Sequence, residues 1–441
     1  MRRTGATGPS HAKITAVPSE YVVNQPDFFA VGPASAPAAI DMGAGVWLSP
    51  GMSNTYLIVT DAGRIVVNTG MWFESKVHKR NFDAVSTAPT RYIVLTQSHT
   101  DHVGGVGLFR DDTTELVAQE NNAVCQADDQ RIHPFRIRRS LPFFAGVMGQ
   151  PGFARGDAAD IPPHPKVVIP DVVFADHHSI ELGGRRIELL AVPGGETIDS
   201  LAVWLPDDGV ALVGNMFSAL FGHMPNLVTM RGDRLRFTLP FLASVQRVIH
   251  LEPEVLLLGH HGPLRGASRI RSECERIRDA VHFVHDATVA AMNRGDDVWT
   301  AMREITLPDH LDLGQAYGRV DWSVRAIWEG YGGWFHQRST LELYPVAPEH
   351  GWSEIVALAG GPDAVAERAA ALIEDAGDHD GLLAAVRLCE MALSVDDRNR
   401  PALHAYALAH ERLAGTHDRA NFWLTHWLDG EIAGTRNRLD R

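Results

Sequence analysis

The 441-residue sequence has few cysteines and no long apolar run. Its three cysteines, Cys125, Cys274 and Cys389, are far apart, and none has a second cysteine at the spacing of a metal site. This usage is typical of buried or inert thiols in a reducing compartment. No stretch of eighteen apolar residues is present, and residues 1–5 lead into polar and small residues rather than an apolar secretory segment. We therefore expect a cytoplasmic protein with no membrane partner.

Positive charge is also in short supply. The chain has 40 lysines and arginines against 54 aspartates and glutamates, which gives a formal net charge of −14. Binding to nucleic-acid phosphates needs a basic face, so this balance argues against a nucleic-acid partner. It leaves room for a small anionic substrate, because a local group of arginines can reverse the sign of the potential inside a cleft.

The most informative segment present is residues 96–105, with the sequence TQSHTDHVGG, which follows the apolar run 92–95. A β-strand delivers its last side chains into a loop, where His99, Asp101 and His102 can converge on one cation. Imidazole and carboxylate are ligands that hold zinc or iron at neutral pH. Taken alone, the motif fits a polar loop with two solvated histidines equally well.

The wider context resembles the metallo-β-lactamase superfamily, whose signature is His-x-His-x-Asp-His after a buried strand, followed by Gly-Gly. The chain matches this signature except at Gln97, which stands where the first histidine belongs. Further segments resemble the family's motifs in the family's order: 53–59, 64–70, 193–197, the hairpin 201–213, and 256–263.

Three features resemble the alkylsulfatase branch of this superfamily. Glu196 matches that branch's glutamate ligand, although Asn215 stands where a second, metal-bridging glutamate belongs. Residues 225–232, PNLVTMRG, and residues 331–335, YGGWF, resemble two further segments of the branch. The resemblance implies an α/β fold, an αββα metallo-β-lactamase sandwich followed by an all-α helical dimerisation domain.

Transferred by position, the resemblance implies two metal-ligand sets: Gln97, His99 and Glu196 for the first metal, and Asp101, His102 and His260 for the second. The second set is intact, whereas Gln97 is a weaker donor than imidazole and Asn215 lacks the bridging charge. We therefore expect unequal occupancy by one or two zinc ions, with iron or manganese as alternatives. His223 and His261 are the nearest spare imidazoles, and a hydrogen-bonding role is favoured for both.

The same resemblance gives the expected chemistry. A metal-activated water would cleave a sulfate or related ester of an apolar alcohol, with Asp101 and Arg231 as the candidate catalytic residues. Asn226 and Arg231 would bind the anionic group. Phe143 and Phe144 would contact the apolar part, because the proline-rich segment 133–170 is interpreted as a long loop over the site. Core packing beneath such a loop is an equal alternative for these two rings.

The domain organisation follows from composition and periodicity. Residues 1–38 are rich in Pro, Ala, Gly and Ser and are expected to form an irregular arm. Short β-rich runs alternate with helical patterns from about residue 40 to 265. The resemblance implies that residues 39–300 form the catalytic domain and residues 301–441 the helical dimerisation domain of a homodimer. Helical patterns are expected from residue 268 to 292 and, as three or four helices, from 362 to 433.

Two further hypotheses belong to other functional classes. The two histidines and one carboxylate of the second set are also the ligand type of a mononuclear non-haem iron oxygenase, so altered metal chemistry is the first alternative. A non-catalytic relative that keeps the fold and the dimer is the second. Metal identity and content discriminate among the three hypotheses.

Overall fold

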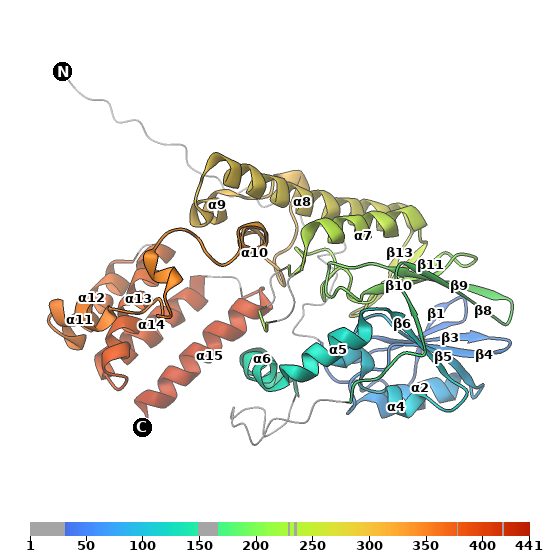
Figure 1. Ribbon diagram of the computed structural model, residues 1–441. Helices are drawn as coiled ribbons and strands as arrows, with labels where there is room; N and C mark the ends of the chain where they lie inside the picture. Colours follow the sequence, from blue (N-terminus) through green and yellow to red (C-terminus); the bar gives the residue numbers. More distant parts are fainter. Residues whose placement is uncertain (1–30, 149–165, 228–229, 233–235, 377, 417–418) are drawn as a thin grey trace.

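The computed structural model describes residues 31–148, 166–227, 230–232, 236–376, 378–416 and 419–441. Figure 1 shows two β-sheets with their covering helices at one end of the molecule and a purely helical region at the other. This arrangement confirms the expected αββα sandwich followed by a helical region.

The first sheet joins an antiparallel half to a parallel half, in the order β1-β2-β3-β4-β5-β6-β7. The strands from β1 to β4 pair antiparallel, and those from β4 to β7 pair parallel. Their bounds are Ile40–Gly43, Val46–Ser49, Thr55–Thr60, Gly63–Val67, Thr90–Leu95, Glu115–Gln119 and Val172–Phe174.

The second sheet has the order β13-β12-β11-β10-β9-β8. Only the β11–β12 pair is parallel among the described strands of this sheet, and the expected hairpin is β10–β11. From β8 to β13 the bounds are His177–Leu182, Arg185–Ala191, Leu201–Leu205, Val210–Leu212, Val255–Leu257 and Leu264–Arg265.

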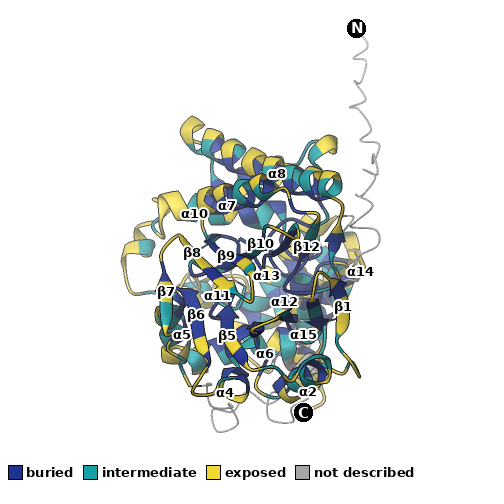
Figure 2. Ribbon diagram, turned by 90° about the vertical axis from the view of Figure 1, so that its right-hand side faces the viewer, coloured by how far each residue is buried: buried dark blue, intermediate teal, exposed yellow. Residues whose placement is uncertain are grey.

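Alternating side chains of the central strands build two separate apolar layers. On β3, Tyr56 and Ile58 face the opposite sheet, whereas Leu57 lies in the layer beneath the outer helices. The period of two in a strand produces this division, and strands buried on both faces consist of continuous apolar residues. All five residues of β4 are buried, and Figure 2 shows the central strands dark blue in the interior.

Helices cover the outer face of each sheet. On the first sheet they are α2 (Ser75–Val85), α3 (Thr100–Val103) and α4 (Val106–Phe109), which bury Phe82, Val103 and Phe109. On the second sheet they are α7 (Thr238–Leu251) and α8 (Ala267–Arg294), the latter matching the helix expected from residue 268. None of the described helices combines the length and apolarity that crossing a bilayer requires.

The helical region begins beside the sandwich. Ala301 of α9 and Val324 of α10 belong to the same apolar core as α7 and α8, so a boundary after residue 300 falls within α9. Of the three or four helices expected from residue 362, four are present as α12 to α15, and each packs on the next. The helices α9 to α15 span Val298–Glu304, Val320–Gly332, Trp352–Leu358, Pro362–Asp375, His379–Val395, Arg400–Thr416 and Phe422–Leu439, with short 3₁₀ helices at Asp309–Leu311 and Thr340–Leu343.

The expectation of a long loop from residue 133 is wrong for its first half. After α5 (Asn122–Arg131), residues His133–Met148 form the helix α6, with Pro142 inside it. Phe143 is 4% exposed and packs edge-on against Trp423 of α15, with 4.9 Å between ring centroids. Burial of this aromatic face outweighs the helix-breaking tendency of proline. Residues 149–165, which make up most of the rest of the expected loop, lie outside the described residues.

Candidate metal centre

The loop after β5 carries most of the candidate ligands and is fixed from its first residue. The amide Oδ1 of Asn68 accepts the Thr96 N–H at 2.9 Å, and Thr69 donates its N–H and its hydroxyl to the His102 carbonyl at 2.8 and 2.9 Å. Gly105 allows this approach, because a Cβ there would lie 2.4 Å from the Thr69 carbonyl oxygen. The loop therefore turns directly into α3, which carries Asp101 and His102.

The segment after β12 brings His260 to the same place. The Asn54 N–H donates to the Gly259 carbonyl at 2.6 Å, and the Asn54 amide group donates to the carbonyls of Leu258 and His261 at 3.0 and 2.7 Å. Gly259 has no room for a side chain, because a Cβ there would lie 1.8 Å from Oδ1 of Asn215. These contacts join segments more than 200 residues apart in the sequence.

The second ligand set, Asp101, His102 and His260, has the protonation states that a divalent cation needs. Nε2 of His102 lies 3.4 Å from Oδ2 of Asp101. Burial lowers the pKa of His102 to about 4 and that of His260 to about 3. Burial opposes ionisation of Asp101, but the three neighbouring histidines and Arg231 lower its pKa overall. Neutral imidazoles and an ionised carboxylate are the forms that bind metal.

The first ligand set, Gln97, His99 and Glu196, is arranged differently. Nε2 of Gln97 lies 2.8 Å from Nδ1 of His99, and this Nδ1 lies 3.8 Å from a carboxylate oxygen of Glu196. The guanidinium of Arg236 donates to both carboxylate oxygens of Glu196, at 3.1 and 2.8 Å. Glu196 is thus already paired with a cation that the chain itself supplies.

Two amides stand at the ligand positions where the family has charged or imidazole groups. Nδ2 of Asn215 lies 3.1 Å from Nε2 of His102. Oδ1 of Asn215 and Oε1 of Gln97 are buried and find no hydrogen-bond partner within the described part of the chain. A buried oxygen without a donor is free to bind a cation, and turning over the Asn215 amide would direct its oxygen toward His102.

In the side-chain arrangement present, no three His, Cys, Asp or Glu side chains of the described ranges form a ready cluster for a metal ion. The donor chemistry of the second set nevertheless fits one divalent cation, because it combines two neutral imidazoles, a carboxylate and the nearby Asn215 oxygen. The first set does not fit, since its one charged member is held by Arg236.

The expected substrate-binding residues divide into two groups. The guanidinium of Arg231 lies over the ring of Phe144, 5.6 Å from its centroid, and acts electrostatically on Asp101. Asn226 is buried close by, and its carbonyl accepts a hydrogen bond from Arg236 at 2.6 Å. Phe143, by contrast, is part of the packing between α6 and α15, which matches the alternative interpretation given for it.

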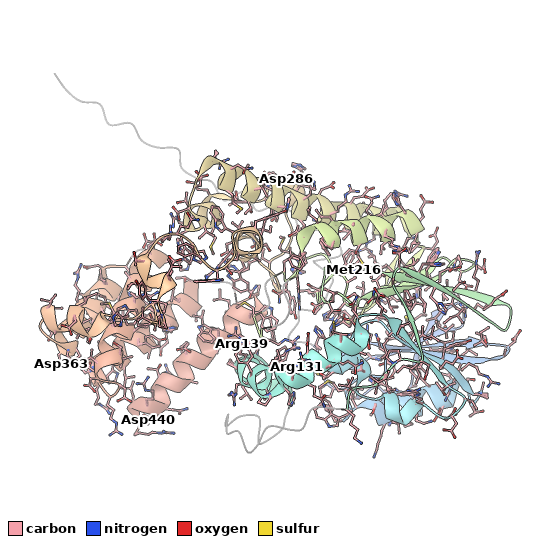
Figure 3. All side chains as sticks on the ribbon, in the orientation of Figure 1. Arg131, Arg139, Met216, Asp286, Asp363 and Asp440 are labelled. Atoms are coloured by element: carbon pink, nitrogen blue, oxygen red, sulfur yellow. The ribbon has the colours of Figure 1, made fainter. Side chains whose placement is uncertain are left out.

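A cavity of about 440 Å³ opens beside the first ligand set. Its size suits a small ligand. Its lining includes Arg131 at the end of α5, labelled in Figure 3, and Glu196 of the loop between β9 and β10. The apolar part of its lining consists of Ile132, Pro193, Ile198, Phe237 and Pro240.

Three residues of the site escaped the sequence reasoning. Arg236 follows Arg231 by five residues and matches no motif considered. Asp199 is fully buried and accepts hydrogen bonds from Ser98 at 3.1 Å and Asn122 at 2.7 Å, and burial raises its pKa. The one feature of the sequence that could have indicated Asp199 is its position between Glu196 and the strand β10. Tyr317 is brought near by the helical region, and no local signal could reveal it; burial and the nearby Glu196 carboxylate raise its pKa above the ordinary value.

The spare histidines have other surroundings. His223 is buried, and its Nδ1 accepts the Ala316 N–H at 3.2 Å, in agreement with the favoured hydrogen-bonding role. Burial lowers the pKa of His223 to about 4. His261 has a positive φ of 63° and follows His260 out of the buried site.

Comparison with known families gives two matches that divide the chain. Residues 48–260 match the metallo-beta-lactamase superfamily, and residues 300–430 match the alkyl sulfatase dimerisation family. The first match contains the candidate ligands, and the second covers α10 to α14 and the start of α15.

Individual relatives agree with these matches. A linear primary-alkylsulfatase of Pseudomonas sp. is 29% identical over 329 residues, 70% of this chain and 61% of that protein. An alkyl/aryl-sulfatase of Saccharomyces cerevisiae is 24% identical over 345 residues, 72% of this chain and 52% of that protein. An (R)-specific secondary-alkylsulfatase of Pseudomonas sp. is 24% identical over 407 residues, 86% of this chain and 59% of that protein. The chain thus spans between half and two thirds of the length of these relatives.

A solved structure supports the same fold. The stereoselective inverting sec-alkylsulfatase Pisa1 from Pseudomonas sp. superposes with a TM-score of 0.77 at 21% identity, over 90% of this chain and 65% of that chain. At this identity the likeness establishes the fold, including the attachment of the helical region to the sandwich.

Proposed function

We propose that this chain is a metal-dependent hydrolase of alkyl sulfate esters, because residues 48–260 match the metallo-beta-lactamase superfamily and residues 300–430 match the alkyl sulfatase dimerisation family. The observation that carries the proposal is the approach of Asp101, His102 and His260 beside Arg231 at the ends of the strands. The named relatives act on alkyl sulfates, which favours hydrolysis over the iron-oxygenase alternative.

The proposed metal site consists of Asp101, His102 and His260, with the Asn215 oxygen beside them. Zinc is the ion that two imidazoles and a carboxylate suit best, and iron and manganese are the alternatives to be separated by elemental analysis. When bound, a divalent ion there supplies Lewis acidity and a nucleophile derived from water at neutral pH.

The chain's own residues would hold and orient the substrate. The Arg231 guanidinium would bind the sulfate oxygens through charge-assisted hydrogen bonds and neutralise charge as the ester bond breaks. The Phe144 ring, 5.6 Å from the guanidinium carbon, would support Arg231 by a cation–π contact. The alkyl chain would lie against the apolar wall of the cavity formed by Ile132, Ile198 and Phe237. Asp101 would accept a proton or hold the attacking water in place.

Direct assay tests this function. Protein loaded with zinc should release inorganic sulfate from dodecyl sulfate or from a secondary octyl sulfate, measured by ion chromatography. Running the reaction in ¹⁸O-labelled water shows which bond breaks, since the label enters sulfate on S–O cleavage and the alcohol on C–O cleavage. Metal-loaded protein that releases no sulfate from any alkyl sulfate would contradict the proposal, and oxygen uptake measured alongside would reveal iron-oxygenase chemistry.

The proposed assembly is a homodimer formed by the helical region. Large apolar side chains between residues 331 and 358 are exposed, including Trp334 at 71% and Leu358 at 90%. Several large apolar side chains exposed in one segment favour a surface that a partner covers. We expect a dimer by light scattering and a monomer for Leu358→Asp. Leu383→Asp, an exposed position on α13, is the matched control and should leave the dimer intact. The domain boundaries after residues 38 and 300 are proposals as well.

A further inference from the structure

The departures from the family's ligand pattern affect the first ligand set and the bridge between the two metals. Gln97 replaces an imidazole of the first set, and Asn215 removes the carboxylate that would bridge two ions. In the second set, Asp101, His102 and His260 keep the expected residue types. The substitutions therefore leave the second set complete and weaken the ligands of the first metal.

The structure also shows which side chain binds the Glu196 carboxylate of the first set. Arg236 and Glu196 form a two-bond fork at 3.1 and 2.8 Å, and both side chains are only 5% exposed. The same guanidinium donates to the Asn226 carbonyl at 2.6 Å. Such planar, doubly bonded pairs are the strong form of an arginine–carboxylate contact. Glu196 thus holds a fixed monocation where the family's glutamate holds a metal ion.

Charge balance opposes a second dication beside this pair. The guanidinium neutralises the Glu196 carboxylate, Gln97 is neutral, and His99 contributes at most a neutral imidazole to a metal. An added dication would meet the positive charge of Arg236 at close range without a free carboxylate to offset it. Releasing Glu196 would in turn leave the buried guanidinium without its partner, which is strongly unfavourable.

We infer that the Arg236 guanidinium replaces the first metal ion, so that this chain binds a single divalent cation at Asp101, His102 and His260. The inference rests on the proposed metal site of the hydrolase and deepens it. Arg236 is a positioning residue: it holds Glu196 and the Asn226 backbone at the wall of the cavity, with a permanent charge that no chelator removes.

Metal counting on a small set of variants tests the replacement. Each protein is stripped with a chelator, reloaded with excess Zn²⁺, desalted and analysed for zinc per chain by mass spectrometry. Wild type and Gln97→His should both hold one zinc, since the new imidazole still meets the Arg236–Glu196 pair. The double variant Gln97→His with Arg236→Met should hold two. The matched control combines Gln97→His with Arg136→Met, which removes another buried arginine of the same cavity, and it should hold one.

Two zinc ions in wild type would overturn the inference, and so would a single zinc in the Gln97→His, Arg236→Met variant that retains the wild-type circular dichroism spectrum. A Co²⁺ titration of the wild-type protein tests the inference without any variant. Its visible absorption should saturate at one equivalent with the electron paramagnetic resonance of an isolated ion. A second equivalent with a spin-coupled pair would overturn the inference.

These counts separate this inference from the proposed function. One zinc per chain without sulfate release would reject alkyl sulfate hydrolysis and leave the role of Arg236 supported. Two zinc ions with sulfate release would reject the role of Arg236 alone. No bound zinc at all would overturn both.

Discussion

The two ligand sets each take residues from the loop after β5, yet they differ in how their charge is balanced. In the second set, Asp101 and two buried neutral imidazoles leave a net negative charge for a cation to neutralise. In the first set, Glu196 is already neutralised by Arg236. The contrast shows that a ligand position can be filled by a suitable residue type and still be unable to bind metal, because a neighbouring side chain satisfies it first.

The largest expected effect breaks the second set. His102→Ala and His260→Ala should each lower kcat/KM for alkyl sulfates by roughly 1,000-fold or more, because the Lewis acid contributes several kcal/mol of transition-state stabilisation. Both should also lose bound zinc. Gln97→Ala is the control and should keep its zinc count. Equal zinc loss in all three variants would show that the two sets do not differ as described.

A smaller effect is expected at the anion-binding side. Arg231→Ala should lower kcat/KM by about 10- to 100-fold, the equivalent of one lost hydrogen bond to a charged group. The zinc count should not change, since Arg231 is no ligand. Arg231→Lys keeps the charge but not the planar fork, so it should recover part of the activity. An unchanged kcat/KM for Arg231→Ala would remove this residue from the site.

Packing around the site should affect stability rather than metal content. Phe143→Ala should lower the free energy of unfolding by about 3–5 kcal/mol, because the buried ring leaves a cavity against Trp423. Phe135→Ala on the same helix is the control, since Phe135 is 51% exposed and should cost little. Denaturant unfolding of both variants provides the measurement. A stable Phe143→Ala protein with a raised KM would instead assign the ring to substrate binding.

The smallest effect is expected for a substitution of His223. It tests whether this histidine is a buried hydrogen-bonding residue or a metal ligand. The pKa of His223 is lowered from 6.5 to about 4, so below pH 6.5 the unfolded chain takes up a proton that the folded chain refuses. Its contribution of about 3 kcal/mol is therefore complete above pH 6.5 and is lost as the pH falls toward 4. His223→Gln should flatten that part of the stability curve and keep the zinc count. His282→Gln, an exposed histidine of α8, should change neither.

Local patterns were sufficient where one segment supplies the whole signal. The apolar run before residue 96 predicted a buried strand, and β5 ends at Leu95, directly before the ligand loop. The hairpin β10–β11 and the helix α8 likewise appeared where periodicity and turn residues indicated them. The prediction for residues 133–148 was wrong. Their prolines suggested a loop, whereas contact with α15 stabilises a helix there.

The sequence by itself determined the residue types at each ligand position, including the amides Gln97 and Asn215, because these are chemical identities that no fold can alter. It also determined the order of motifs from which the sandwich follows. Only the tertiary structure decided that Arg236 pairs with Glu196, that His260 approaches Asp101 and His102, and that Tyr317 and Trp423 of the helical region pack with Phe143. Such contacts join residues 40 to more than 200 positions apart, and burial and charge pairing at that range leave no trace in local periodicity.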